Sequence, residues 1–166
     1  MTLMQPTFLF LLSAFACLLI ANARLRAQLL LVVPLLALVW IFFLSEGNHA
    51  SIQFFGLTLE FLRVDGLSKI FAIIFSIAAF LGGLYAWHVR DLMQQVATLA
   101  YAGSAIGGVF AGDLLTLFLY WELTAVTSVF LIWARRTEGA FHTGVRYLLI
   151  QVLSGVLLLM LSLIHI

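Results

Sequence analysis

Long apolar runs, interrupted by only a few charges, recur along this sequence and restrict what it can fold into. An α-helix crosses a bilayer core of about 30 Å with about 20 apolar residues, because it rises about 1.5 Å per residue. Runs of that kind lie at 3–22, 27–44, 67–87, 92–111, 114–134 and 146–166. The sequence therefore predicts an all-α, polytopic transmembrane helix bundle with about six spans.

The composition excludes several other classes of protein. Of the 166 residues, 64% are apolar and 9% are charged, against about a quarter charged in a soluble domain. A net charge of +1 provides no basic field for nucleic acid, so the lipid bilayer is the expected partner. Cys17 is the only cysteine and lies in an apolar run. We expect no disulfide, metal, cofactor or catalytic centre in this chain.

Two local patterns predict how the runs are connected and packed. Ser45–Asp65 alternates apolar and polar residues around Gly56, which indicates a small hairpin on the membrane surface. Small residues spaced four apart allow another helix to approach closely. The fourth run has this pattern at Gly103, Gly107, Gly108 and Gly112.

The basic residues predict the orientation of the chain. The first, third and fifth connections carry six of the eight Lys and Arg residues, namely Arg24, Arg26, Arg90, Arg135, Arg136 and Arg146. Basic residues concentrate on the cytoplasmic side of membrane proteins. We therefore expect these connections to be cytoplasmic and the amino terminus to face the opposite side.

Three charged residues have local structural interpretations. Asp65 and Asp113 directly precede the third and fifth runs, where an Asp side chain caps the free N–H groups of a helix. Lys69 follows Asp65 by four residues, a spacing that favours an ion pair on one helix face. We also expect Lys69 to extend toward the membrane interface.

Glu122 lies nine residues past Asp113, about 13 Å into the membrane and close to its midplane. A charged residue at that depth costs about 3 kcal/mol to insert, so an intramembrane acid indicates a functional site. Helical projection places only apolar residues of the same run beside Glu122. Its partner is then expected from sequence outside this chain, another subunit or water. The alternative is a protonated glutamate that only packs inside the bundle.

Three motifs between about residues 60 and 160 resemble one family of membrane proteins. They are Val64-Asp65-Gly66-Leu67-Ser68, then Gly112-Asp113-Leu114-Leu115 with Tyr120-Trp121-Glu122, and Arg146-Tyr147-Leu148-Leu149 with Leu153-Ser154-Gly155. They resemble the amino-terminal part of the antiporter-like subunits. That family comprises the Mrp-type cation/proton antiporter subunits and the homologous proton-pumping subunits of respiratory complex I and membrane-bound hydrogenases. The third motif is most similar to the D-type subunits of the Mrp antiporters.

The resemblance implies a role for Glu122 in a proton path, paired with a Lys on a later broken helix. Asp65 and Arg146 match family positions and, with Lys69, are candidate supporting residues. Because Lys69 is the only lysine and the second inverted repeat is missing, residues 1–160 are expected to be the amino-terminal part of a longer subunit.

The resemblance further implies other membrane subunits as partners, protons and Na⁺ as transported ions, and the cell membrane of a prokaryote. Two alternatives to an antiporter subunit stay open at this point. One is a proton-pumping subunit of an NADH:quinone oxidoreductase or hydrogenase, and the other is a structural membrane subunit without transport.

The last six residues, Leu161-Ser162-Leu163-Ile164-His165-Ile166, form a separate segment in this interpretation. They resemble the peptide that the transposon end of common sequencing adapters encodes. We expect residues 161–166 to be adapter read-through.

Overall fold

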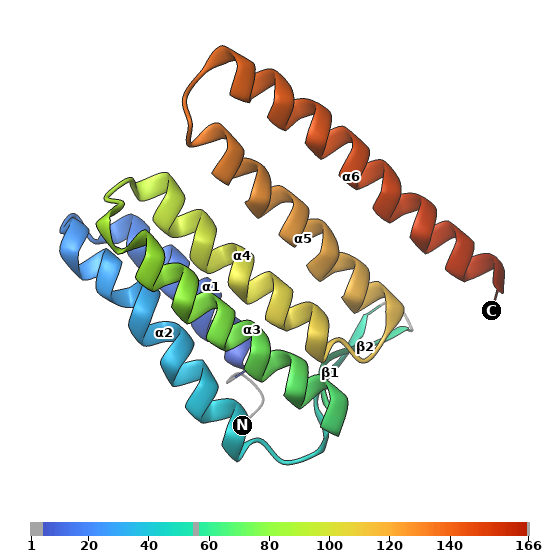
Figure 1. Cartoon of the computed structure of the whole chain (residues 1–166). Coiled ribbons are helices and arrows are strands. Elements are labelled where there is room, and N and C mark those ends of the chain that lie inside the picture. Colours follow the sequence, from blue (N-terminus) through green and yellow to red (C-terminus); the bar gives the residue numbers. More distant parts are fainter. Residues whose placement is uncertain (1–4, 55–56, 166) are drawn as a thin grey trace.

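A computed structural model describes residues 5–54 and 57–165 of the chain, and in this part α-helices and one β-hairpin alternate as Figure 1 shows. The elements are α1 (Pro6–Leu19), α2 (Ala23–Phe43), β1 (Gly47–Phe54), β2 (Leu57–Val64), α3 (Gly66–Tyr85), the 3-10 helix η1 (Ala86–His88), α4 (Leu92–Phe110), α5 (Leu114–Trp133) and α6 (Glu138–His165). The predicted all-α polytopic bundle is confirmed. The predicted spans 3–22 and 146–166 extend past the described residues at their outer ends.

Four helices of the described chain are long and apolar enough to cross a membrane on their own. They are α2, α3 with η1, α5, and α6 up to Ser162. The other two predicted spans differ in character. Helix α1 has only 14 residues, and α4 contains Gln94, Gln95 and three glycines, which lower its mean hydropathy. Helix α4 packs against α1, α3 and α5, so its polar residues are covered by neighbouring helices.

Helix α6 begins earlier than the apolar run predicts. It starts at Glu138 rather than at residue 146, and Arg146 therefore lies inside α6 instead of in the fifth connection. The backbone N–H of Ala140 donates to Thr137 Oγ1 at 3.2 Å, so Thr137 caps the helix. Glu138 in the first turn also suits the positive end of the helix dipole.

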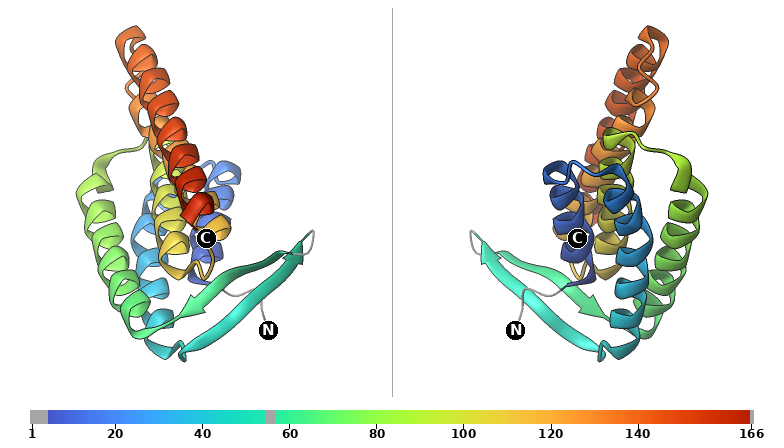
Figure 2. Two further views of the ribbon diagram at one scale, coloured as in Figure 1. Left: turned by 90° about the vertical axis from the view of Figure 1, so that its right-hand side faces the viewer. Right: turned by 90° about the vertical axis from the view of Figure 1, so that its left-hand side faces the viewer.

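The predicted hairpin between the second and third runs is confirmed. Strands β1 and β2 pair antiparallel from Gly47 opposite Val64 to Phe54 opposite Leu57. The predicted turn residue Gly56 lies outside the described residues. The hairpin lies at one end of the bundle and extends sideways from it (Figure 2).

The α1–α2, α3–α4 and α5–α6 connections lie together at the end opposite the hairpin (Figure 1). A buried arginine joins two of these connections. Arg26 Nε donates to Gln95 Oε1 at 2.8 Å, and its Nη1 donates to the Ile20 carbonyl at 2.8 Å. A further donation reaches the Arg90 carbonyl at 3.4 Å. Neutral acceptors therefore satisfy this buried charge and hold α2 against the start of α4.

Glycines set the distance between α4 and its neighbours. A Cβ built at Gly103 would lie 2.7 Å from Phe10 Cβ on α1, and one at Gly107 would lie 2.7 Å from Tyr120 Cζ on α5. Gly108 makes only ordinary contact, with Tyr120 Cβ at 3.8 Å. The prediction that the fourth span packs through its glycines is confirmed, and it packs against two different helices.

The contact at Gly107 predicts a stability effect. We expect Gly107→Ala to lower the unfolding temperature, because the methyl group overlaps the Tyr120 ring and such overpacking costs about 1–3 kcal/mol. Gly82→Ala on α3 is the control, since a Cβ there meets nothing within 4 Å. Thermal unfolding in detergent, followed by circular dichroism, measures both. Equal unfolding temperatures for the two variants would contradict the packing role of Gly107.

Candidate functional site

The depth of Glu122 in the bundle depends on where α5 begins. Asp113 caps this helix, and its carboxylate accepts a hydrogen bond from the Thr116 backbone N–H at 2.8 Å. Helix α5 then runs through Leu114–Trp133 without a break. Glu122 is the ninth of its 20 residues, which places it close to the middle of a span about 30 Å long.

The carboxyl group of Glu122 is directed at α6. Its Oε1 occupies the space that a side chain at Gly155 would need, and the ring of Phe118 borders the same space. Glu122 Oε1 is buried, and no hydrogen-bond donor reaches it within residues 5–54 and 57–165. A carboxyl oxygen without a donor inside a helix bundle is uncommon, because buried polar atoms are normally hydrogen-bonded.

Other polar groups of α5 point away from Glu122. Thr116, Tyr120 and Thr127 are buried. Ser128 Oγ lies 2.8 Å from Tyr147 OH and donates to it, so one hydrogen bond crosses between α5 and α6.

A cavity of about 430 Å³ lies where α3, α4, α5 and α6 meet. Its polar lining consists of Tyr101, Ser104, Tyr120, Thr124, Tyr147 and Gln151, with Trp121 beside them. Hydroxyl and amide groups of this kind can hold water. Glu122 is not among the lining residues, so the cavity and the acid lie on different faces of α5.

Asp113 also holds the hairpin, a contact that the sequence interpretation missed. Its Oδ2 accepts from the Glu60 backbone N–H of β2 at 2.6 Å, and the Gly112 N–H donates to the Glu60 carbonyl at 2.9 Å. Burial by itself raises the pKa of the Asp113 carboxyl, but the hydrogen bonds from Thr116 and Glu60 outweigh it. The pKa therefore lies below its ordinary value.

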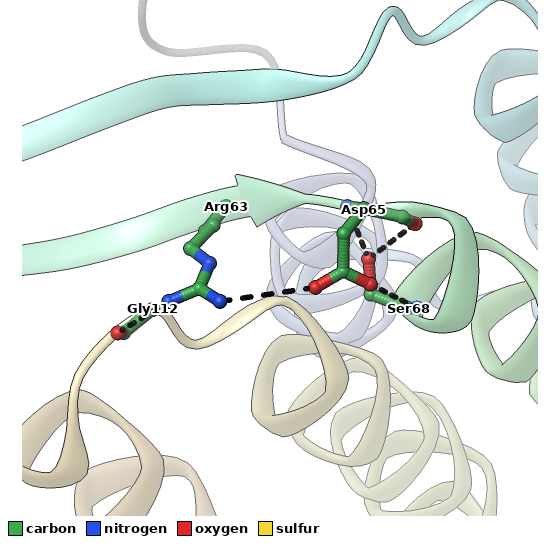
Figure 3. A network of polar contacts seen from close by, with 4 residues as sticks. All are labelled: Arg63, Asp65, Ser68 and Gly112. Atoms are coloured by element: carbon green, nitrogen blue, oxygen red, sulfur yellow. Dashed lines mark hydrogen bonds and ion pairs between the residues drawn. The ribbon is translucent and has the colours of Figure 1, made fainter.

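Asp65 is the predicted cap of α3 and forms a reciprocal pair with Ser68. The Ser68 N–H donates to Asp65 Oδ1 at 2.7 Å, and the Asp65 N–H donates to Ser68 Oγ at 2.9 Å. Arg63 lies 4.0 Å from Asp65 and also contacts the Gly112 carbonyl (Figure 3). The hydrogen bond from the Ser68 backbone is the main cause that lowers the pKa of Asp65.

The predicted ion pair of Asp65 with Lys69 does not form. Lys69 Nζ donates instead to the Leu44 carbonyl at 2.7 Å. The last carbonyls of a helix lack partners within that helix, and Leu44 follows the end of α2, so this acceptor is available to Lys69.

The candidate residues do not form one cluster. Asp65 and Lys69 lie beside the hairpin at the start of α3, whereas Arg146 is exposed on α6. Arg146 precedes Gly155 by nine residues, about 13 Å along α6 from the position that Glu122 contacts. Glu122 is therefore the one candidate that lies in the middle of a described helix pair.

Similarity to known proteins agrees with this arrangement. No protein-family model matches the chain. The Na⁺/H⁺ antiporter subunit A1 of Staphylococcus haemolyticus is 28% identical over 146 residues, which cover 77% of this chain and 18% of that protein. The subunit A1 of Staphylococcus aureus is 30% identical over 112 residues, covering 63% of this chain and 14% of that protein. The chain thus spans less than a fifth of the length of these relatives.

The fold and these relatives together define a class. The chain is a multi-pass membrane protein that is similar to Na⁺/H⁺ antiporter subunits. Both relatives are A-type subunits, so the finer resemblance to the D-type subunits stays a prediction.

The double role of Asp113 predicts a graded response to substitution. Asp113→Ala removes the acceptors for both Thr116 and Glu60, and we expect it to destabilise the chain by about 1 kcal/mol or more. Asp113→Asn keeps one oxygen for the Thr116 N–H but replaces the other with an NH₂ group, which cannot accept from Glu60. Thermal unfolding should rank the parent above Asp113→Asn and Asp113→Ala last, with faster amide exchange at Glu60 in both variants.

The same contact predicts a pH dependence. Because the folded pKa of Asp113 lies below its unfolded value of about 4, its stabilisation is present above pH 4 and is lost as the pH falls through the folded pKa. The difference in unfolding temperature between the parent and Asp113→Asn should therefore shrink toward pH 3. A difference that stays constant between pH 7 and pH 3 would contradict this account.

Proposed function

We propose that this chain is part of an ion-translocating subunit of a multisubunit cation/proton antiporter, in which Glu122 carries a proton near the membrane centre. One observation supports this most strongly. A carboxyl group lies midway along a transmembrane helix, and its buried oxygen has no donor in the described chain. Bilayer insertion makes such an acid costly, so a proton-carrying role accounts for its presence better than packing does.

A cationic partner would allow Glu122 to load and release a proton. An ammonium group about 4 Å away attracts a carboxylate by about 4 kcal/mol at an effective dielectric constant of about 20. When the cation is close, the carboxylate is favoured, and when the cation moves away, the neutral acid is favoured. Lys69 is engaged at the hairpin end of the bundle, so we infer that the partner cation lies outside this chain.

The wider proposal concerns orientation and assembly. We place the arginine-bearing connections in the cytoplasm and the amino terminus on the other side, in the cell membrane of a prokaryote. Because the chain spans less than a fifth of its relatives, we treat residues 1–160 as the amino-terminal part of a longer subunit that assembles with other membrane subunits. Protons and Na⁺ are the proposed ions. We propose that residues 161–166 derive from a sequencing adapter, which the codons of the parent reading frame would test.

The function is tested by Glu122→Gln in the complete parent complex. Gln keeps the shape of the side chain but cannot release a proton, so we expect cation-driven proton flux to fall to background while assembly stays normal. Flux is measured in vesicles with a pH-sensitive dye. Glu122→Asp is the companion variant, because it keeps the acid and shortens its reach.

The alternative of a packing glutamate makes the opposite prediction. If Glu122→Gln transports at the parent rate and assembles normally, Glu122 is a structural residue and the proposed proton-carrying role is wrong. A loss of both assembly and flux would likewise count against a role in transport alone.

A further inference from the structure

We propose that Gly155 is a positioning residue for Glu122, because its missing side chain leaves the recess in α6 where the Glu122 carboxyl lies. The consequence for transport rests on the proposed function of Glu122. The positioning itself rests on the contact between α5 and α6.

The recess is bounded by two residues of α5. A Cβ at position 155 would overlap Glu122 Oε1, and it would lie 3.2 Å from Glu122 Cδ and 3.4 Å from Phe118 Cε2. Because the Glu122 side chain ends in this space, even a methyl group on α6 would force the carboxyl to move. Gly155 is buried although most of the surrounding α6 surface is exposed, which marks this point as the contact of α5 with α6.

Gly155 differs in this respect from another glycine of the same helix. A Cβ at Gly139 would meet nothing within 4 Å, so an alanine is tolerated there. Glycine weakens a helix interior relative to alanine, and at Gly155 the close approach of an acid provides a reason for it. Gly139 thereby provides a matched control on α6.

Other contacts fix the height of Glu122 against Gly155. Gly144 of α6 lies against the Trp133 ring of α5, and Trp133 Nε1 donates to the Phe141 carbonyl at 3.3 Å. The hydrogen bond from Ser128 to Tyr147 lies between these contacts and the Glu122 level. Helix α5 therefore cannot slide along α6 without losing several contacts, and the carboxyl stays at one depth.

The position of the carboxyl matters for the exchange of charge. The attraction between an acid and an approaching cation falls with distance, and the displacement of a reacting group by about 1 Å can slow a reaction severely. A methyl group at position 155 would push the carboxyl out of the recess and toward the lipid-facing edge of the helix pair. Its reactivity with an apolar reagent should then rise while transport falls.

The test compares Gly155→Ala, Gly139→Ala, Glu122→Asp and the double variant Gly155→Ala/Glu122→Asp in the assembled parent complex. Proton flux in vesicles is the first readout. The second is the rate at which dicyclohexylcarbodiimide, an apolar carboxyl reagent, modifies residue 122, measured by peptide mass spectrometry. The second readout does not require that Glu122 carry protons.

We expect Gly155→Ala to lower flux by about tenfold or more and to speed modification of Glu122, whereas Gly139→Ala matches the parent in both. The double variant should transport faster than Gly155→Ala alone, because Asp is one methylene shorter and fits beside the added methyl group. A general packing defect would show no such rescue. If Gly155→Ala fails to assemble, recovery of assembly in the double variant supports the proposal.

Three results would overturn the proposal: modification of Glu122 at the parent rate in Gly155→Ala, no rescue by the shorter acid, or failure of both variants to assemble. Failure of the proposed function is seen separately. If Glu122→Gln transports normally but Gly155→Ala still speeds modification, Gly155 positions the carboxyl although Glu122 carries no proton.

Discussion

Close approach at positions without side chains sets the geometry of this bundle, and Glu122 depends on it from both sides. Helix α5 lies between α4, where the Tyr120 ring rests on Gly107, and α6, where the Glu122 carboxyl rests on Gly155. In lipid the hydrophobic effect does not drive helices together, so close van der Waals contact and hydrogen bonds supply the association. The two glycine contacts therefore fix both neighbours of the helix that carries the acid.

The two ends of the bundle are held by different chemistry. At the hairpin end, Asp113 ties the first turn of α5 to β2, so the depth of the span is coupled to a rigid strand pair. At the opposite end, Arg26 crosslinks the α1–α2 connection and α4 through neutral acceptors. Arg136 and Asp91 add an ion pair at 2.5 Å between the α5–α6 and α3–α4 connections. Such anchors leave the middle of the bundle to apolar packing and to Glu122.

Sequence reasoning predicted what depends on local chemistry and missed what depends on neighbours. The hairpin, the caps at Asp65 and Asp113 and the mid-span position of Glu122 follow from patterns within one segment. The start of α6 was wrong because apolar runs were counted, while the helix begins with a polar turn capped by Thr137. The partners of Lys69, Arg26 and Asp113 are backbone or amide groups distant in sequence, which no spacing rule indicates. The same limit applies to Gly155, which faces Glu122 only because two helices pack at that height.

Two ionisable groups inside this bundle differ in a way that separates structure from function. Arg26 donates to the acceptors of Gln95, Ile20, Ala21 and Arg90, so its charge is balanced in one fixed arrangement. Glu122 Oε1 has no donor anywhere in the described chain, although hydroxyl groups of Thr124 and Ser128 lie on the same helix and bond elsewhere. A satisfied charge gains nothing from changing its state, because any change breaks hydrogen bonds. An acid without a donor loses no such bonds when it takes up or releases a proton, and its state is left for an approaching cation to decide.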